Sequence, residues 1–492
     1  MKKNLIRVTA GSFLILVALV TLGQCVGLGL NHDEHQFIAP AVLWAREGLL
    51  PYRDVPLFHQ PYLIALDAVA VKHAASPLLA ARLISGAAAF LTALLLFGCA
   101  WLATREKPIG LRLVSAISIV TLWLTSHLFL VASGRTWNHD LPSLLAISAL
   151  AILLFSETPR HWHWLAAGLL AGLATGSRLT FAPFAGLLPL TALLWGNVPL
   201  RTRFFHLTLS AIGVALALLP SLWFYLQSPE GYLFGNFQFP RLPLLEADNS
   251  RILKTITPWR KMRFFFKEVV ASNLPLALAF IGLAVGSLHQ SRMQLPWRWI
   301  VPSLALVAGA FAPSRYEMQH FYIVAPLAAL LAAQLLQATS TRLIYGLLAV
   351  AAISVVMGGK VFLRAGEVCH PQDWDVTRIH DRALDLRARV PKGKILTLTP
   401  IVVVESGLSI YPPLATGIFG WKFAHLVPPP RRERLGLLAP ADLDSYLASE
   451  PPAAILTDGE EAKLEKPLIS YAARLGYRPE RLDDATTLWL RP

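Results

Sequence analysis

The sequence predicts a polytopic α-helical membrane protein that ends in a small α/β domain. The first observation is composition: 55% of the 492 residues are hydrophobic and 15% are charged, well outside the range of soluble globular domains. The second is a series of charge-poor apolar runs of spanning length. The third is an abrupt change after residue 361 to a charged stretch with strand-like runs such as ILTLTPIVVV and TTLWLRP and a helix-like ADLDSYLAS. We therefore expect a transmembrane domain over 1–361 and an extracytoplasmic α/β domain over 362–492.

The apolar runs predict about eleven transmembrane helices. Ten of them have the length and composition of a span, and an eleventh, 164–176, is shorter and marginal. The ten lie near 8–30, 83–103, 113–132, 141–156, 179–197, 205–226, 274–290, 299–312, 321–338 and 343–361.

Basic residues in the short loops indicate the orientation of these spans. The N-terminal MKKNLIR precedes an apolar run without a small-residue cleavage pattern, so we expect an uncleaved first span with a cytoplasmic N-terminus. Eleven spans then place Arg105, Arg201 and Arg342 on the cytoplasmic side, as the positive-inside bias requires. We expect a multi-pass protein of the bacterial inner membrane, surrounded by membrane lipids, with its C-terminal domain in the periplasm. The segments then facing outward are 31–76, 133–140, 227–273, 313–320 and 362–492.

The formal net charge of +14 does not indicate a nucleic-acid partner. Lysine and arginine lie mainly in the short loops between apolar runs, where they set topology. We therefore expect no nucleic acid and look for chemistry in the polar segments of the outer face.

Adjacent carboxylates, Asp33 and Glu34, follow the first span and are flanked by His32 and His35. Gln36 stands three positions after Asp33, so one interpretation is that Asp33 caps the helix that follows. The other interpretation is catalytic, because burial of either carboxylate would raise its pKa toward the strength of a useful general base.

The helix expected after these carboxylates covers about residues 36–47. Gly48 closes it and Pro51 follows, which is a typical end signal. Its amphipathic pattern is that of a helix able to lie along a membrane surface.

The second outer loop, SGRTWNHDLP at 133–142, presents Asn138, His139 and Asp140 directly before a span. Asp140 has two interpretations as well: an N-cap ahead of Leu141 and Pro142, or a functional group. The functional interpretation gains support because the first two outer loops both present histidine and aspartate on the same side of the membrane, and both interpretations stay open.

Three further segments supply cations to the outer face. Arg178 lies at the end of 164–176, where a helix cap is the alternative. The segment PSRYEMQHFYIVAP contains Arg315, Tyr316 and His320, which an aromatic belt and snorkelling also explain. The long loop 227–273 is rich in basic residues, including Arg260 and Lys261, and is either a lipid-facing loop or a phosphate site.

These segments resemble a known family. DEHQFIAPAVLWAREGLLPYRD, followed by FHQPYL with His59, resembles the first outer loop of the type C glycosyltransferases, in particular their protein mannosyltransferase and aminoarabinose transferase branch. NHD resembles the second acidic motif of that family, and RYEMQHFYIVAPLAAL its Arg-Tyr, His, Pro signature. The resemblance covers roughly 1–361 and is most specific in the first loop.

The resemblance implies a type C glycosyltransferase fold and a sugar donor carried on polyprenyl phosphate. The sugar would pass, with inversion, to an extracytoplasmic lipid, glycan or protein. Asp33 would accept the acceptor proton, Glu34 would orient it or bind acceptor, and Asp140 would help to hold acceptor or metal. The candidate substrate-binding residues, several of them cations for the departing phosphate, are His35, His59, His139, Arg178, Arg260, Lys261, Arg315, Tyr316 and His320.

The histidines beside the carboxylates depart from the family pattern. His32, His35 and His139 could combine with aspartate in a divalent metal site, but spacing alone does not establish one. The cofactor stays open at this point.

Two other function classes remain as alternatives: a transporter or flippase of lipid-linked glycans, and a non-catalytic envelope glycan assembly protein. Transporters place ionisable residues near the bilayer midplane and often contain inverted repeats. Here the charges gather at one face and no repeat is visible, which favours the enzyme.

Overall fold

The computed structural model describes residues 2–156, 158–196, 198–242, 257–289, 297–313, 317–459 and 462–492. The chain forms two compact units, each assembled from three stretches of sequence. We call them the helical unit, Met1–Cys25, Ser85–Pro220 and Lys254–Cys369, and the loop–sheet unit, Val26–Ile84, Ser221–Leu253 and His370–Pro492. The predicted division at residue 361 concerned membrane topology and stays a prediction.

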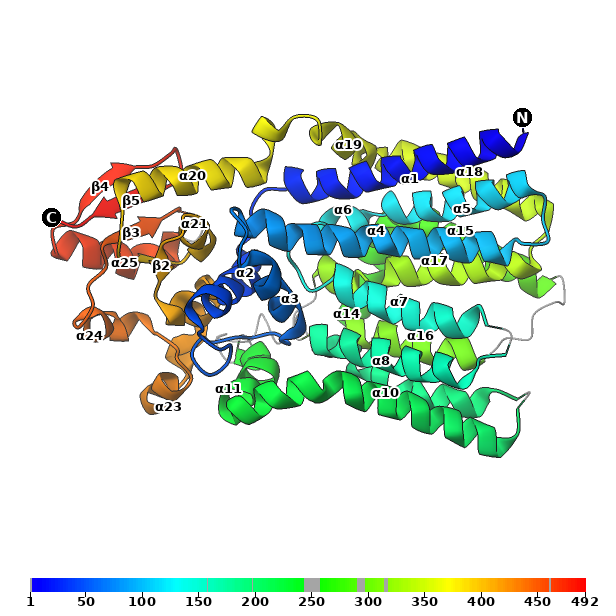
Figure 1. The fold of residues 1–492 in the computed structure, drawn as a ribbon, viewed down its shortest axis with the longest axis horizontal. Coiled ribbons are helices and arrows are strands. Elements are labelled where there is room, and N and C mark those ends of the chain that lie inside the picture. The colour runs from blue at the N-terminus through cyan, green and yellow to red at the C-terminus, as the bar shows by residue number, and fades with distance from the viewer. Residues whose placement is uncertain are drawn as a thin grey trace. The chain divides into compact units, whose positions relative to one another are not determined.

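The helical unit consists of long helices that run alongside one another (Figure 1). Within it α5 packs on α17 and α18, α15 packs on the same two helices, and α7 packs on α8. Its helices are α1 (Lys2–Gly27), α4 (Pro77–Ala103), α5 (Ile109–Leu124), α6 (His127–Ala132), α7 (Asp140–Leu154), α8 (His161–Ser177), α9 (Ala182–Leu187), α10 (Leu200–Gln227), α14 (Pro258–Phe264), α15 (Leu274–His289), α16 (Trp297–Ala310), α17 (Val324–Leu335), α18 (Thr341–Gly358) and α19 (Arg364–Glu367), with α1, α4 and α10 extending past its boundaries.

Several helices are apolar and long enough to cross a membrane. Among the described residues five qualify singly, and a bent pair, Pro258–Val270 with Leu274–Leu288, adds a sixth at an angle of 95°. Shorter apolar helices accompany them, and the marginal run 164–176 lies within α8. The structure therefore supports a membrane protein with several spans, while the count of eleven stays a prediction.

Small residues let helices α8 and α10 approach closely. A Cβ added at Gly168 would lie 2.0 Å from the carbonyl oxygen of Ser210, and one added at Gly213 would lie 2.4 Å from that of Leu165. Helices in a membrane gain little from hydrophobic association with each other, so close packing through small residues is one of their main attractions.

The first part of the loop–sheet unit contains the segment that follows α1. The helix predicted over 36–47 is confirmed as α2 (His35–Val42) continuing into η2 (Leu43–Glu47), and Gly48 ends it with a φ of 73°. All eight residues of α2 are buried, and the helix contacts α3 (Tyr62–Val71) and α21 (Pro400–Glu405). The expectation that it lies along the membrane surface is therefore wrong.

The C-terminal part of the loop–sheet unit contains the predicted α/β fold, with a five-stranded sheet in the order β2-β1-β3-β5-β4. β1 (Lys394–Thr397) is parallel to β2 (Ser409–Ile410) and to β3 (Ala454–Thr457). β5 (Thr487–Leu490) is antiparallel to β3 and to β4 (Arg478–Arg481). The helices of this part are α20 (Asp375–Arg389), α21, α22 (Ile418–Phe423), α23 (Pro429–Arg434), α24 (Leu443–Leu447) and α25 (Ala462–Arg474), and the middle stretch of the unit contributes α11 (Pro229–Leu233).

One strand prediction is only half right. In ILTLTPIVVV the strand β1 stops at Thr397, and PIVVV begins helix α21 with Pro400 in its first turn. Proline suits the first helical position, because its missing N–H would have no partner there. The predictions for TTLWL and LDSYL are confirmed as β5 and α24.

Buried side chains hold the α/β fold and the first-loop region in one unit. The sheet core combines Leu396 and Ile455 with Trp421 and with Leu468 of α25. Glu405 of α21 accepts a hydrogen bond from the Leu78 N–H at 3.0 Å, at the start of α4. Helix α2, which directly follows the two carboxylates, also packs on α21, so this part of the first loop is supported by the C-terminal fold.

Candidate functional site

Asn31, not Asp33, caps the helical turn that carries the two carboxylates. Its Oδ1 accepts a hydrogen bond from the Asp33 N–H at 2.9 Å, and the Glu34 carboxylate accepts one from the Asn31 N–H at 3.1 Å. This is a capping box with asparagine in the serine position. The helix-capping interpretation of Asp33 is therefore wrong, because the capping oxygen belongs to its neighbour.

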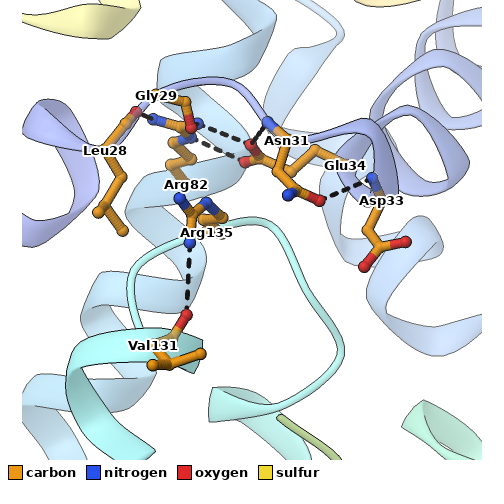
Figure 2. Close-up of polar contacts among 8 residues, drawn as sticks. All are labelled: Leu28, Gly29, Asn31, Asp33, Glu34, Arg82, Val131 and Arg135. Atoms are coloured by element: carbon orange, nitrogen blue, oxygen red, sulfur yellow. Dashed lines mark hydrogen bonds and ion pairs between the residues drawn. The ribbon is translucent and has the colours of Figure 1, made fainter. Parts of the chain in front are cut away.

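Glu34 is held in a buried ion pair with Arg82 of α4. The Arg82 Nε donates to Oε1 at 2.8 Å and Nη2 donates to Oε2 at 2.6 Å, and neither side chain is exposed. Arg82 also donates to the carbonyl oxygens of Leu28 at 2.5 Å and Gly29 at 3.1 Å, so it ties the segment just after α1 to the second turn of α4 (Figure 2). Buried charges are tolerated when they are paired and hydrogen-bonded in this way.

Asp33 directs its carboxylate away from Arg82 (Figure 2). Its side chain is 27% exposed, and Oδ1 lies 3.7 Å from the Nε2 of His32. The His32 ring in turn packs against Phe419, with centroids 5.7 Å apart. The two adjacent carboxylates therefore occupy different environments: Glu34 is enclosed by an arginine, and Asp33 reaches solvent.

A pocket of the loop–sheet unit lies beside Asp33. Thr399 and Asp458 follow the parallel strands β1 and β3, so both stand at the carboxyl edge of the sheet, where α/β folds commonly bind ligands. The residues that line this pocket are His32, His35, Leu398, Thr399, Ile418, Asp458 and Glu465. His35, a predicted substrate-binding residue, is thus brought next to the C-terminal fold.

Two features shape that pocket. Glu465 accepts hydrogen bonds from the N–H groups of Asp458 and Gly459, both at 3.0 Å, and burial raises the pKa of its carboxyl above the ordinary value. Gly417 has a φ of 62°, and a Cβ there would lie 2.9 Å from the Leu398 oxygen and 3.2 Å from the His35 ring. A larger residue at 417 would therefore push into the pocket wall.

His59 lies in the second half of the first loop. Its ring stacks on Phe37 with centroids 4.8 Å apart, and its carbonyl oxygen accepts a hydrogen bond from the Tyr52 hydroxyl. The adjacent Gln60 bonds Asn236 at 2.9 Å and Tyr232 at 2.9 Å. These polar links, which the sequence did not predict, join the first loop to the segment after α10.

In the helical unit, Asp140 is a buried cross-link between the second outer loop and the start of α17. Its Oδ1 accepts a hydrogen bond from the Tyr322 hydroxyl at 2.5 Å, and its Oδ2 accepts one from the Gly134 N–H at 3.1 Å. Helix α7 begins at Asp140 itself, and the residue before it, His139, makes no side-chain cap. The N-cap interpretation of Asp140 is therefore wrong, and Tyr322 is a partner that sequence reasoning missed.

A polar pocket in the helical unit brings together three predicted residues from distant segments. Arg178 contacts the His139 ring and donates to the Asn138 carbonyl oxygen at 3.4 Å. Arg178 also stands at the C-terminal end of α8, where a cation is favourable. The polar residues that line the pocket are His139, Ser143, Arg178, Thr180, His320 and Tyr322.

The remaining cation predictions lie apart from this pocket or outside the described residues. Lys261 donates to the carbonyl oxygens of Phe311 at 2.9 Å and Pro313 at 2.5 Å, so its ammonium ties α14 to the end of α16. Arg260 is exposed on α14. Arg315 and Tyr316 lie outside the described residues.

Within the described ranges, no group of three or more histidine, cysteine, aspartate or glutamate side chains is arranged to hold a metal ion. In particular, Glu34 and Asp140 already accept hydrogen bonds on both of their carboxylate oxygens. We therefore assign no chemical step to a metal.

Neither protein-family models nor curated protein sequences match the chain significantly. Several solved structures do match the chain. ArnT from Cupriavidus metallidurans bound to undecaprenyl phosphate matches with a TM-score of 0.65 and 14% identity over 98% of this chain and 97% of that one. The apo state of the same protein matches with a TM-score of 0.62 and 15% identity, over 99% and 97%. The oligosaccharyltransferase of Archaeoglobus fulgidus matches with a TM-score of 0.48 and 14% identity, over 91% and 69%. The chain thus shares the fold of ArnT, a type C glycosyltransferase, along almost its whole length, as the first-loop motif predicted.

Proposed function

We propose that this protein is an integral-membrane glycosyltransferase that moves a sugar from a polyprenyl-phosphate carrier to an acceptor hydroxyl or amine with inversion. The observation that carries the proposal is the contrast between adjacent carboxylates: Arg82 encloses Glu34, whereas Asp33 faces away from that pair and reaches solvent. A fold shared with ArnT, whose crystal structure holds undecaprenyl phosphate, supports a lipid-phosphate donor.

In this mechanism Asp33 is the general base. Its carboxylate takes the proton of the acceptor hydroxyl or amine while the acceptor atom bonds to the anomeric carbon. The bond from that carbon to the phosphate oxygen breaks on the opposite side, and its electron pair leaves with the lipid phosphate. Glu34 is a positioning residue, because protonating it would leave the buried Arg82 charge uncompensated.

The pocket around Arg178 is our candidate for the departing phosphate. A guanidinium, two histidines and three hydroxyl side chains line it, and such donors stabilise the charge that develops on a leaving phosphate. The Asp140–Tyr322 hydrogen bond holds the residue next to His139 and therefore the loop that carries it.

The pocket beside Asp33 is our candidate for the acceptor. It offers carboxylate, hydroxyl and imidazole groups, which suit the hydroxyls of a glycan or an amine rather than a second phosphate. Under the predicted topology this side is periplasmic, where a lipid-borne sugar meets acceptors of the envelope. The acceptor classes to be tested are lipids, glycans and proteins of the envelope.

The test compares wild type, Asp33→Asn and the matched variant Asp381→Asn, an exposed aspartate of α20. Each is purified in detergent and incubated with a panel of polyprenyl-phosphate sugars and envelope extract, and sugar transfer is measured. We expect turnover by wild type and Asp381→Asn, and a loss of about 100-fold or more in Asp33→Asn, the range of general-base catalysis. Equal turnover in all three would remove Asp33 as the base. If wild type turns over no donor but moves a labelled lipid-linked glycan across proteoliposomes, the transporter alternative replaces the enzyme.

A further inference from the structure

A second cavity in the helical unit shares no residue with the pocket around Arg178. It lies where α5 and α18 end and α15 begins, and its empty volume is about 530 Å³, including the space open to the surface. Its polar lining includes Thr125, Ser126, His127, Ser272, Asn273 and Lys360. Polar groups at the ends of apolar helices therefore gather around one hollow that the proposed reaction does not use.

The break between α14 and α15 explains why this hollow is polar. The two halves of the bent pair meet at 95°, and Asn273 lies in the break. Its Nδ2 donates to the Val269 carbonyl oxygen at 2.6 Å, and its Oδ1 accepts from the Leu128 N–H at 3.2 Å. Thr125 of the adjacent helix end donates to Ser354 at 2.9 Å. Asn273 and Thr125 therefore have hydrogen-bond partners within the protein.

The two basic side chains of the lining, His127 and Lys360, do not take part in such hydrogen bonds with the other described residues. In the part of the chain that the structure describes, neither His127 nor Lys360 has an ion-pair or hydrogen-bond partner, and the cavity lining contains no carboxylate. Lys360 is exposed, and His127 is partly exposed. A lysine and a histidine on a wall without acidic residues attract an anion, and an imidazole can donate a hydrogen bond to phosphate in either protonation state.

Large apolar side chains are exposed on the two helices, α15 and α18, that contribute residues to this cavity. On α18 and just after it, Val356 is 88% exposed, Met357 60% and Leu363 75%, and on α15 Leu278 is 51% exposed. Both helices belong to segments apolar enough to span a membrane, so these side chains suit contact with acyl or polyprenyl chains. A ligand that matches both the basic side chains of the cavity and the exposed apolar side chains of α15 and α18 carries a phosphate and a hydrocarbon tail.

We propose that this cavity binds the phosphate of a membrane lipid, with Lys360 and His127 contacting the phosphate and the exposed faces of α15 and α18 contacting the tail. Two lipids share this chemistry: a polyprenyl phosphate and a glycerophospholipid. Neither source depends on Asp33, so the inference stands apart from the proposed enzymatic function.

Native mass spectrometry of the delipidated full chain tests the inference with three probes: undecaprenyl phosphate, phosphatidylglycerol and uncharged undecaprenol. The variants are Lys360→Ala with His127→Ala, Lys360→Arg with His127 retained, and Arg342→Ala as a matched cation at the other end of α18. We expect the double variant to bind a phosphate lipid at this cavity about tenfold more weakly than wild type does. At a lipid concentration that saturates wild type, it should therefore carry up to one phosphate lipid fewer per chain. Lys360→Arg and Arg342→Ala should retain that lipid, and undecaprenol binding should not change.

The outcomes separate the two sources and the inference itself. A loss confined to undecaprenyl phosphate assigns the cavity to the polyprenyl carrier, and a loss that includes phosphatidylglycerol assigns it to bulk phospholipid. Unchanged stoichiometry and affinity for both phosphate lipids in the correctly folded double variant would overturn the proposal. Asp33→Asn should bind all three probes as wild type does. Lipid binding at this cavity and sugar transfer are therefore separate measurements, and either proposal can fail without the other.

Discussion

The Arg82 guanidinium holds the Glu34 carboxylate through two hydrogen bonds, at 2.8 and 2.6 Å, with both side chains fully buried. Removing one partner would leave the other charge buried without compensation, which typically costs about 3–5 kcal/mol. We therefore predict that Arg82→Met lowers the free energy of unfolding by about that amount. Detergent-titration unfolding and the melting temperature measure the change.

A double substitution separates charge from packing at this pair. Glu34→Leu combined with Arg82→Met removes both charges and should regain most of the stability that Arg82→Met loses, since apolar replacements of buried pairs are often neutral. A double variant as unstable as the single one would show that the hydrogen bonds of Arg82 to Leu28 and Gly29, rather than the charge pair, dominate.

The Asp140–Tyr322 hydrogen bond leads to a prediction about positioning. Tyr322→Phe leaves the buried carboxylate with one donor fewer, which should destabilise the helical unit by about 1–3 kcal/mol. If the bond positions His139, kcat should also fall, by up to about 100-fold, with little change in the KM of the acceptor. Tyr345→Phe, which removes the hydroxyl of an exposed tyrosine on α18, is the control. Unchanged kcat in a destabilised Tyr322→Phe would limit this bond to a structural role.

Arg178 should determine how well the lipid phosphate is held. Arg178→Ala is expected to raise the KM of the donor by about 10–100-fold, the effect of losing a charged hydrogen bond. Arg178→Lys should restore the donor KM only partly, because a guanidinium contacts the His139 ring and the Asn138 carbonyl in a geometry that an ammonium does not reproduce. Steady-state kinetics of Arg201→Ala, which removes an exposed arginine in the first turn of α10, controls for net charge. Equal donor KM in Arg178→Ala and wild type would place the phosphate elsewhere.

Local signals in the sequence identified the carboxylates, the end of their helix at Gly48 and the histidines beside them, because each depends on neighbours within a few residues. The partners that define their roles are distant: Arg82 lies 48 residues from Glu34, and Tyr322 lies 182 residues from Asp140. No periodicity or capping rule connects such pairs. For this reason the sequence left open which carboxylate is the base, and the capping alternatives for Asp33 and Asp140 could be decided only in three dimensions.

The same limit explains the error at α21. Three consecutive valines favour a strand on propensity alone, yet they form a buried helix packed on α2 and α20. Pro400 was a usable signal for a helix start, but the residues that bury the helix come from other parts of the chain. Tertiary contacts, rather than the intrinsic preference of valine, therefore determine the secondary structure of this segment.

Glu465 leads to a pH prediction for the loop–sheet unit. Burial raises the pKa of its carboxyl in the folded protein, so the folded state binds this proton more tightly than the unfolded state does. Its contribution to stability is fully present below the unfolded pKa, about 4.3, and is lost as the pH rises through the folded pKa. Wild type should therefore lose stability relative to Glu465→Gln over that interval, by at most about 1.4 kcal/mol per pH unit.

Melting temperatures from pH ~4 to ~8 measure this loss of stability, with Glu433→Gln, which neutralises an exposed carboxylate of α23, as the control. If the two melting curves stay parallel across the interval, the N–H donors of Asp458 and Gly459 offset the effect of burial, and the Glu465 carboxyl makes no pH-dependent contribution to stability.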